Sequence, residues 1–99
     1  METEQVAGLR MDRARPQGAA ARRPALLLVH GAGHGSWCWE NWLGVLPGRG
    51  WEAVAPSLRN HPGSRAAPER EFLRETRLQD YVEDVAAVAA HVGRPVVAV

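Results

Sequence analysis

The sequence contains no lysine, no isoleucine and only one cysteine, Cys38. A single cysteine cannot form an intrachain disulfide, so the chain is not a disulfide-stabilised scaffold, and a reducing, cytoplasmic location is expected. No apolar run approaches the roughly 18 residues that a membrane-spanning helix needs. The 12 basic residues, all of them arginine, nearly balance the 11 acidic ones and leave a formal charge of +1. This balance predicts neither a nucleic-acid partner nor a membrane partner.

The length and composition predict a single domain behind a disordered leader. The chain has 99 residues, of which 45% are hydrophobic and 23% charged, as in globular proteins. Residues 1–24 are rich in Arg, Ala and Gly, and their apolar residues stand alone, so this segment is expected to be a mobile leader. Residues 25–99 are expected to form the folded domain.

Beyond the leader, strand and helix patterns alternate. Three short apolar runs predict buried strands, at residues 25–29, 51–55 and 95–99. Apolar residues at intervals of three and four predict two amphipathic helices, at 39–46 and 78–92. Because strands and helices alternate, the predicted fold class is α/β, with three parallel strands joined by two right-handed crossover helices.

The boundaries of these elements carry their own signals. Thr76 and Gln79 have the spacing of a capping box before the second helix, and Gly93 follows its end. Pro56 is expected to end the second strand. Residues 56–75 are long for a connection inside a compact unit, so they predict either a lid or binding loop or a partly disordered segment.

A glycine-rich segment directly follows the first predicted strand and reads His30-Gly31-Ala32-Gly33-His34-Gly35-Ser36-Trp37. Its alternating glycines allow a sharp turn and leave consecutive N–H groups exposed at the carboxyl end of the strand. Such a turn can bind an anion. Ser36 is expected to cap the following helix rather than to act as a nucleophile.

Two other interpretations of this segment fit less well. A dinucleotide-binding loop needs Gly-x-Gly-x-x-Gly, but Ser36 replaces the third glycine after Gly31 and Gly33. A metal site would need a second pair of ligands beyond the candidates His30, His34 and Cys38. We therefore expect neither a metal nor a cofactor, and we interpret Cys38 as an unreactive packing residue.

With its flanking residues, this segment resembles the α/β-hydrolase superfamily, in particular its esterase and hydroxynitrile-lyase branch. The resemblance covers residues 25–99 and implies hydrolysis of an ester or other acyl bond of a small molecule by a serine nucleophile, without a cofactor. It implies that the backbone N–H of Ala32 is one of two oxyanion donors. It also implies that the turn is shaped by His30, Gly31 and Gly33. The aromatic residues Trp37, Trp39 and Trp42 are candidates for lining the substrate pocket, of which we choose Trp37, although aromatic residues on a helix face more often belong to the core.

The sequence departs from the family pattern at the nucleophile. No Gly-x-Ser-x-Gly surrounds any of the serines, which are Ser36, Ser57 and Ser64. The family order of nucleophile, acid and histidine would also place every histidine of this chain too early. We therefore expect a catalytic triad to be absent and the chain to be an inactive N-terminal portion of a hydrolase, truncated before the nucleophile elbow. The alternative is a noncatalytic binding or assembly module that associates through the free edge of its last strand.

Overall fold

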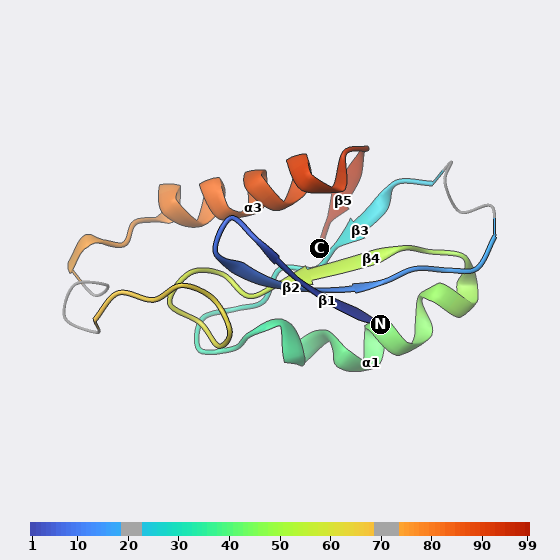
Figure 1. The fold of residues 1–99 in the computed structure, drawn as a ribbon, viewed down its shortest axis with the longest axis horizontal. Helices are drawn as coiled ribbons and strands as arrows, with labels where there is room; N and C mark the ends of the chain where they lie inside the picture. Colours follow the sequence, from blue (N-terminus) through green and yellow to red (C-terminus); the bar gives the residue numbers. More distant parts are fainter. Residues whose placement is uncertain (19–22, 69–73) are drawn as a thin grey trace.

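A five-stranded mixed sheet lies between helices on its two faces (Figure 1). The computed structural model describes residues 1–18, 23–68 and 74–99. The strand order across the sheet is β1-β2-β4-β3-β5. The strands are β1 (Glu2–Val6), β2 (Leu9–Ala14), β3 (Ala25–Leu27), β4 (Ala53–Pro56) and β5 (Val96–Ala98). The α-helices are α1 (Glu40–Val45) and α3 (Leu78–Val92), and α1 is flanked by the 3-10 segments η2 (Ser36–Trp39) and η3 (Pro47–Arg49).

The predicted parallel core of three strands is confirmed. Strand β3 pairs in parallel with β4 on one side and with β5 on the other, and Leu26 lies opposite both Ala53 and Val97. The connections between these strands contain α1 and α3, which cover opposite faces of the sheet (Figure 1). The alternation of apolar runs with helical periodicity therefore correctly predicts parallel strands joined by crossover helices.

The expectation of a disordered leader over residues 1–24 is wrong for most of its length. Residues 2–14 form the antiparallel hairpin β1–β2, and β2 pairs antiparallel with β4. Ala7 and Gly8 form the two-residue turn, and both have positive φ angles, of 51° and 78°, as a type I′ turn requires. The part of this expectation that concerns residues 19–22 lies outside the described residues.

The hairpin β1–β2 packs onto the rest of the domain because its apolar residues complete the core beneath α3. One buried cluster lies between α3 and the sheet and comprises Val6, Leu9, Met11, Leu27, Val54 and Val88. A second cluster on the opposite face, beneath α1, comprises Ala14, Leu28, Leu43, Ala53 and Ala55. Successive residues of each strand thus contribute to different faces, as the pleat of a strand dictates.

Helix α3 has the predicted length, but its N-terminus is capped differently. Arg77, not Thr76, is the N-cap, and its backbone N–H donates to Asp80 Oδ2 at 2.7 Å. Gly93 ends the helix with a φ of 73°, a conformation that glycine adopts without steric cost. Pro56 is the last residue of β4, so the strand ends there, as expected. Within the described part of the chain, no helix has both the length and the apolar character of a membrane span.

Glu52, an unexpected charge beside a buried strand, belongs to an ionic cluster. It is only 3% exposed, and its carboxylate accepts hydrogen bonds from Arg13 at 3.1 Å and from Arg94 at 3.2 Å. Arg13 comes from β2, and Arg94 lies between α3 and β5. The cluster therefore ties the hairpin to the parallel part of the sheet.

Candidate functional site

The glycine-rich turn, which we define as His30–Gly35, begins at the carboxyl end of β3. The His34 N–H donates to the Gly31 carbonyl at 3.2 Å, and Gly33 has a φ of 79°, which favours glycine over residues with a side chain. Ala32 is exposed at the tip. Across the described residues, no acceptor is found for the Ala32 N–H. The predicted role of this N–H as an oxyanion donor stays a prediction at this point.

His30 is buried and held by two hydrogen bonds of opposite polarity. Its Nδ1 lies 2.8 Å from the Gly31 carbonyl, which can only accept. Its Nε2 lies 2.9 Å from the backbone nitrogen of Leu58, whose N–H can only donate. Both bonds form together only in the neutral ring that carries its proton on Nδ1. The fold thus selects one tautomer of His30 and uses it to join the turn to the segment after β4.

The surroundings of His30 oppose its protonation. Burial lowers the pKa of His30 below its ordinary value of 6.5, because a charged ring is poorly solvated there. The neighbouring rings of His61 and His34 lower the pKa further, while the bond to the Gly31 carbonyl acts against them. The His30 and His61 rings lie 4.6 Å apart, centroid to centroid.

We expect the fold to lose stability as the pH falls below about 6.5, because the unfolded chain then takes up a proton at His30 that the folded chain resists. The loss continues down to the lowered folded-state pKa and is absent above the unfolded value. Chemical denaturation of the wild type and of His30→Asn between pH 5 and 8 measures it. The difference between the two proteins should shrink toward acid pH, whereas His34→Gln, changed at an exposed ring, should follow the wild type. Parallel profiles for wild type and His30→Asn would contradict the assignment.

A cavity of about 440 Å³ opens beside the glycine-rich turn. Its walls come from the end of β3 and the turn, from the segment after β4, and from the N-terminal half of α3. The lining residues are Val29, His30, Gly31, Ala32, Leu58, His61, Leu78, Tyr81, Val82 and Val85. The apolar face of α3 therefore has two uses, because its C-terminal half covers the sheet and its N-terminal half lines this cavity.

Trp37, expected to line a substrate pocket, is not among the residues around this cavity. Its side chain is 56% exposed and packs edge-on against His34, with ring centroids 5.6 Å apart. Ser36 is not the cap of the following helical segment, because it is the first residue inside η2, and the N-cap of η2 is Gly35. Instead Ser36 is buried, and its backbone N–H donates to Ser57 Oγ at 2.8 Å.

The segment of residues 57–65, which we call the 57–65 loop, is hydrogen-bonded to the β1–β2 hairpin. The Ser57 N–H donates to the Arg10 carbonyl at 2.8 Å, and the Arg10 N–H donates to Ser64 Oγ at 2.9 Å. The Arg65 N–H donates to the Gly8 carbonyl at 2.7 Å. These contacts argue against the expected disorder over residues 57–65, whereas the expected lid or binding loop stays a prediction. Residues 69–73 of that expectation lie outside the described residues.

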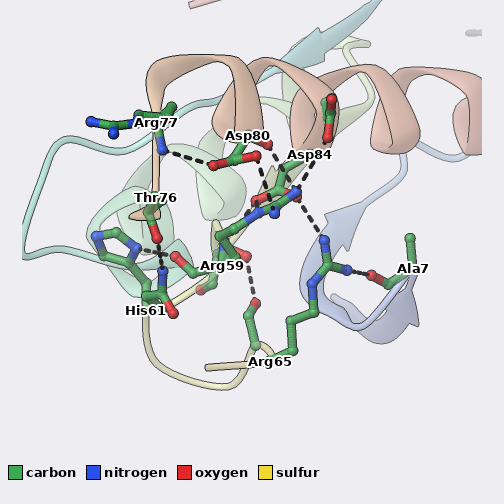
Figure 2. Close-up of polar contacts among 12 residues, drawn as sticks. Ala7, Arg59, His61, Arg65, Thr76, Arg77, Asp80 and Asp84 are labelled. Atoms are coloured by element: carbon green, nitrogen blue, oxygen red, sulfur yellow. Dashed lines mark hydrogen bonds and ion pairs between the residues drawn. The ribbon is translucent and has the colours of Figure 1, made fainter. Parts of the chain in front are cut away.

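The other face of the 57–65 loop is held by Asp84 of α3 (Figure 2). The Asp84 carboxylate accepts the backbone N–H of Arg59 at 2.9 Å and the Arg59 guanidinium at 2.9 Å. Arg65 also donates to it, at 3.2 Å. These hydrogen bonds to Asp84 raise the pKa of Arg59, so the arginine stays charged.

The groups of a serine-hydrolase triad are not assembled in the described residues. No serine hydroxyl there is hydrogen-bonded to a histidine ring. Burial raises the pKa of the Cys38 thiol, which disfavours the reactive thiolate. Over the same described ranges, no group of three or more His, Cys, Asp or Glu residues is placed to hold a metal ion.

Sequence reasoning missed several residues that the fold brings to this place. His61 carries no motif, yet it packs on His30 and borders the cavity. No motif singles out Asp84 either, although it is only 2% exposed. A signal was present for Asp84, since it interrupts an apolar helix face, and an acid in such a place needs a partner.

Comparison with known proteins identifies a family for this chain. The family model described as "Alpha/beta hydrolase family" matches residues 26–99. Among curated proteins, no match was found.

Similar solved structures include three epoxide hydrolases. One from Vigna radiata shares 26% identity with a TM-score of 0.71, and the chain covers 30% of it. Potato epoxide hydrolase shares 26% identity with a TM-score of 0.74 and 31% coverage, and one from an endophytic Streptomyces shares 22% identity with a TM-score of 0.70 and 28% coverage. Each alignment covers 98% of this chain, so the chain spans somewhat under a third of these proteins.

Proposed function

The chain belongs to the alpha/beta hydrolase family, and on that premise we propose that it forms the part of a hydrolase that supplies one oxyanion donor, the backbone N–H of Ala32. The observation that carries this proposal is that Ala32 is an exposed residue lining an apolar cavity, and that its N–H has no acceptor among the described residues. Gly31 and Gly33 shape the turn, and His30 holds it in place.

The proposed substrate is a small molecule with an ester or another acyl bond. Attack on its carbonyl carbon places negative charge on the oxygen, and an N–H at that position stabilises the charge. In enzymes of this type, removing one such donor lowers the rate by about 10²–10³. The similar solved structures are epoxide hydrolases, and opening an epoxide also places negative charge on an oxygen. Epoxides are therefore the second substrate class that this donor would serve.

The cavity supports a substrate with an apolar portion. Leu58, Val82 and Val85 contribute aliphatic surface, and Tyr81 contributes an aromatic ring. Burying apolar surface against such walls stabilises binding by roughly 25 cal/mol per Å². We propose that the apolar portion lies there while the reacting oxygen meets the Ala32 N–H. Trp37 could contact a substrate only outside this cavity.

We further propose that residues 1–99 by themselves do not turn over esters. The proposal is supported by the absence, in the ranges that the structure describes, of a serine bonded to a histidine. The single cysteine supports a cytoplasmic location.

The test is an NMR titration of the labelled chain with sodium benzoate and, separately, with toluene. The benzoate carboxylate represents the developing oxyanion, and the ring represents the apolar portion. Both ligands should shift signals of Val82 and Val85, but only benzoate should shift the Ala32 amide. The variant Ala32→Pro, which lacks the N–H, should still bind toluene and should lose at least about tenfold in benzoate affinity, as expected for a hydrogen bond to a charged group.

An unshifted Ala32 amide at saturating benzoate would refute the oxyanion role. The same samples test the lack of turnover, since hydrolysis of p-nitrophenyl acetate should stay at the background rate. Activity that survives Ser36→Ala and Ser64→Ala but falls with Ala32→Pro would mean that a nucleophile has been overlooked.

The noncatalytic alternative is supported by the exposed edge of β5. Among residues 1–18, 23–68 and 74–99 this strand pairs only with β3, and the residues Val97 and Val99 are 48% and 53% exposed. An apolar edge with unpaired backbone groups favours strand addition by a second chain. A defined dimer of the purified chain that forms through β5 would favour this module over the hydrolase part.

A further inference from the structure

We infer that Asp84 is a positioning residue for the glycine-rich turn, acting through Arg59 and Leu58 on His30. The inference goes beyond the oxyanion proposal and rests on it for its catalytic meaning. Asp84 lies on α3, whereas the turn follows β3. The link between them passes through the 57–65 loop and ends in the turn, and its hydrogen bonds are joined by the peptide bond between Leu58 and Arg59.

The first step of the link fixes the backbone of Arg59. Asp84 Oδ2 accepts the Arg59 N–H at 2.9 Å, while Oδ1 accepts the Arg59 Nη2 at 2.9 Å. The same guanidinium donates to the Asp80 carbonyl at 3.1 Å. One carboxylate thus holds both the main chain and the side chain of Arg59 against α3 (Figure 2).

The second step passes from Arg59 to both histidines. The preceding residue, Leu58, donates its N–H to His30 Nε2 at 2.9 Å. The Arg59 carbonyl lies 2.9 Å from Nδ1 of His61, and the His61 ring packs on His30. A displacement of Arg59 would therefore move the donor that selects the His30 tautomer and also the ring that covers it.

The third step connects His30 to the turn. With Nε2 occupied by the Leu58 N–H, the ring proton is on Nδ1 and is donated to the Gly31 carbonyl. Gly31 directly precedes Ala32, so this bond orients the peptide that carries the Ala32 N–H. Without the Leu58 donor, the proton can move to Nε2, and the bond to Gly31 is lost.

The burial of Asp84 favours a positioning role over a contribution to stability alone. Its side chain is 1% exposed, and its partners Arg59 and Arg65 are 21% and 47% exposed. An ion pair with a buried carboxylate contributes little net stability compared with apolar residues of the same size, because the carboxylate loses its hydration. What the pair supplies is a fixed direction for each hydrogen bond, and the Arg59 N–H lies directly next to the site.

The experiment compares Asp84→Asn with Glu83→Gln in the ¹⁵N-labelled chain. Glu83 is the matched control, because it is the adjacent acid, lies 3.8 Å from the same Arg59 Nη2 and is 60% exposed. The readouts are the ¹⁵N shifts of the His30 ring, which report its tautomer, and the hydrogen exchange of the Leu58 amide. In Asp84→Asn we expect a mixture of His30 tautomers and Leu58 exchange about tenfold faster or more, as for a locally opened segment. Glu83→Gln should match the wild type in both.

The inference is overturned if folded Asp84→Asn keeps the wild-type tautomer and the wild-type Leu58 exchange. If Asp84→Asn does not fold, Arg59→Lys takes its place, because it keeps a positive charge opposite Asp84 but cannot donate to the carboxylate and the Asp80 carbonyl in the same geometry. Arg59→Lys should shift the two readouts in the same direction, and unchanged values would overturn the inference. Neither readout involves a ligand, so a failed benzoate titration and a failed positioning test remain distinguishable.

Discussion

Replacing Glu52 with alanine is expected to lower the free energy of unfolding by about 3–5 kcal/mol, the usual cost of removing one partner of a buried ion pair. Glu52 is 3% exposed and accepts hydrogen bonds from both Arg13 and Arg94. Arg13 is 7% exposed, so without Glu52 its buried charge would keep only the carboxylate of Glu4, 3.5 Å from its Nη1. Because a domain of this size is stable by only about 5–15 kcal/mol, much of the chain would be close to unfolding. Urea denaturation followed by circular dichroism measures the change.

The matched control is Glu2→Ala, which removes an exposed ion pair of the same hairpin. Glu2 lies 3.6 Å from Arg15, and both side chains are more than half exposed, so the expected loss is below about 1 kcal/mol. The double variant Arg13→Met/Glu52→Leu removes both charges and should be more stable than Glu52→Ala alone. Equal losses for Glu52→Ala and Glu2→Ala would show that the cluster is solvated instead of buried.

Leu9→Ala is expected to destabilise the fold by about 2–5 kcal/mol, as other truncations of fully buried leucines do. Leu9 is 0% exposed and packs in the cluster beneath α3, although it lies in the segment expected to be disordered. The same urea titration measures the effect. Leu78→Ala is the matched control, because Leu78 is 79% exposed and its removal should change stability by no more than about 0.5 kcal/mol.

This comparison decides whether the hairpin is part of the folded domain. If residues 1–14 did not pack on the domain, Leu9→Ala would change the free energy of unfolding as little as Leu78→Ala does. A large loss confined to Leu9→Ala would show that β1–β2 completes the core and covers the edge of β4.

The hairpin was missed because its sequence signals are weak. Strand β1 has polar residues at four of its five positions (ETEQV), so it lacks the apolar run that identifies a buried strand. The Ala7-Gly8 turn lacks the Asn-Gly or Asp-Gly pair that most clearly marks a two-residue hairpin turn. Leu9 and Met11 alternate with polar residues, but alternation over so few positions becomes informative only once β4 offers an edge to pair with.

Some parts of the candidate site depend on neighbouring residues and could be predicted, whereas others depend on residues distant in the sequence and could not. The glycine-rich turn could be predicted because its conformation depends on consecutive residues, and Gly33 adopts a positive φ there. His61 and Asp84 could not be predicted, because they approach the turn only when the 57–65 loop packs against α3. Trp37 was expected in the pocket from its place in the chain, but the course of η2 leaves it exposed.

The alternation of strands and helices over residues 25–99 and the parallel core thus follow from the amino-acid sequence by itself. Each depends on periodicity or on backbone freedom within a few neighbouring residues. The packing of the hairpin, the burial of Glu52 and the link from Asp84 to His30 were decided by the tertiary structure. They depend on charges and hydrogen-bonding groups from separate segments, whose partners exist only after the sheet and its two layers of helices have assembled.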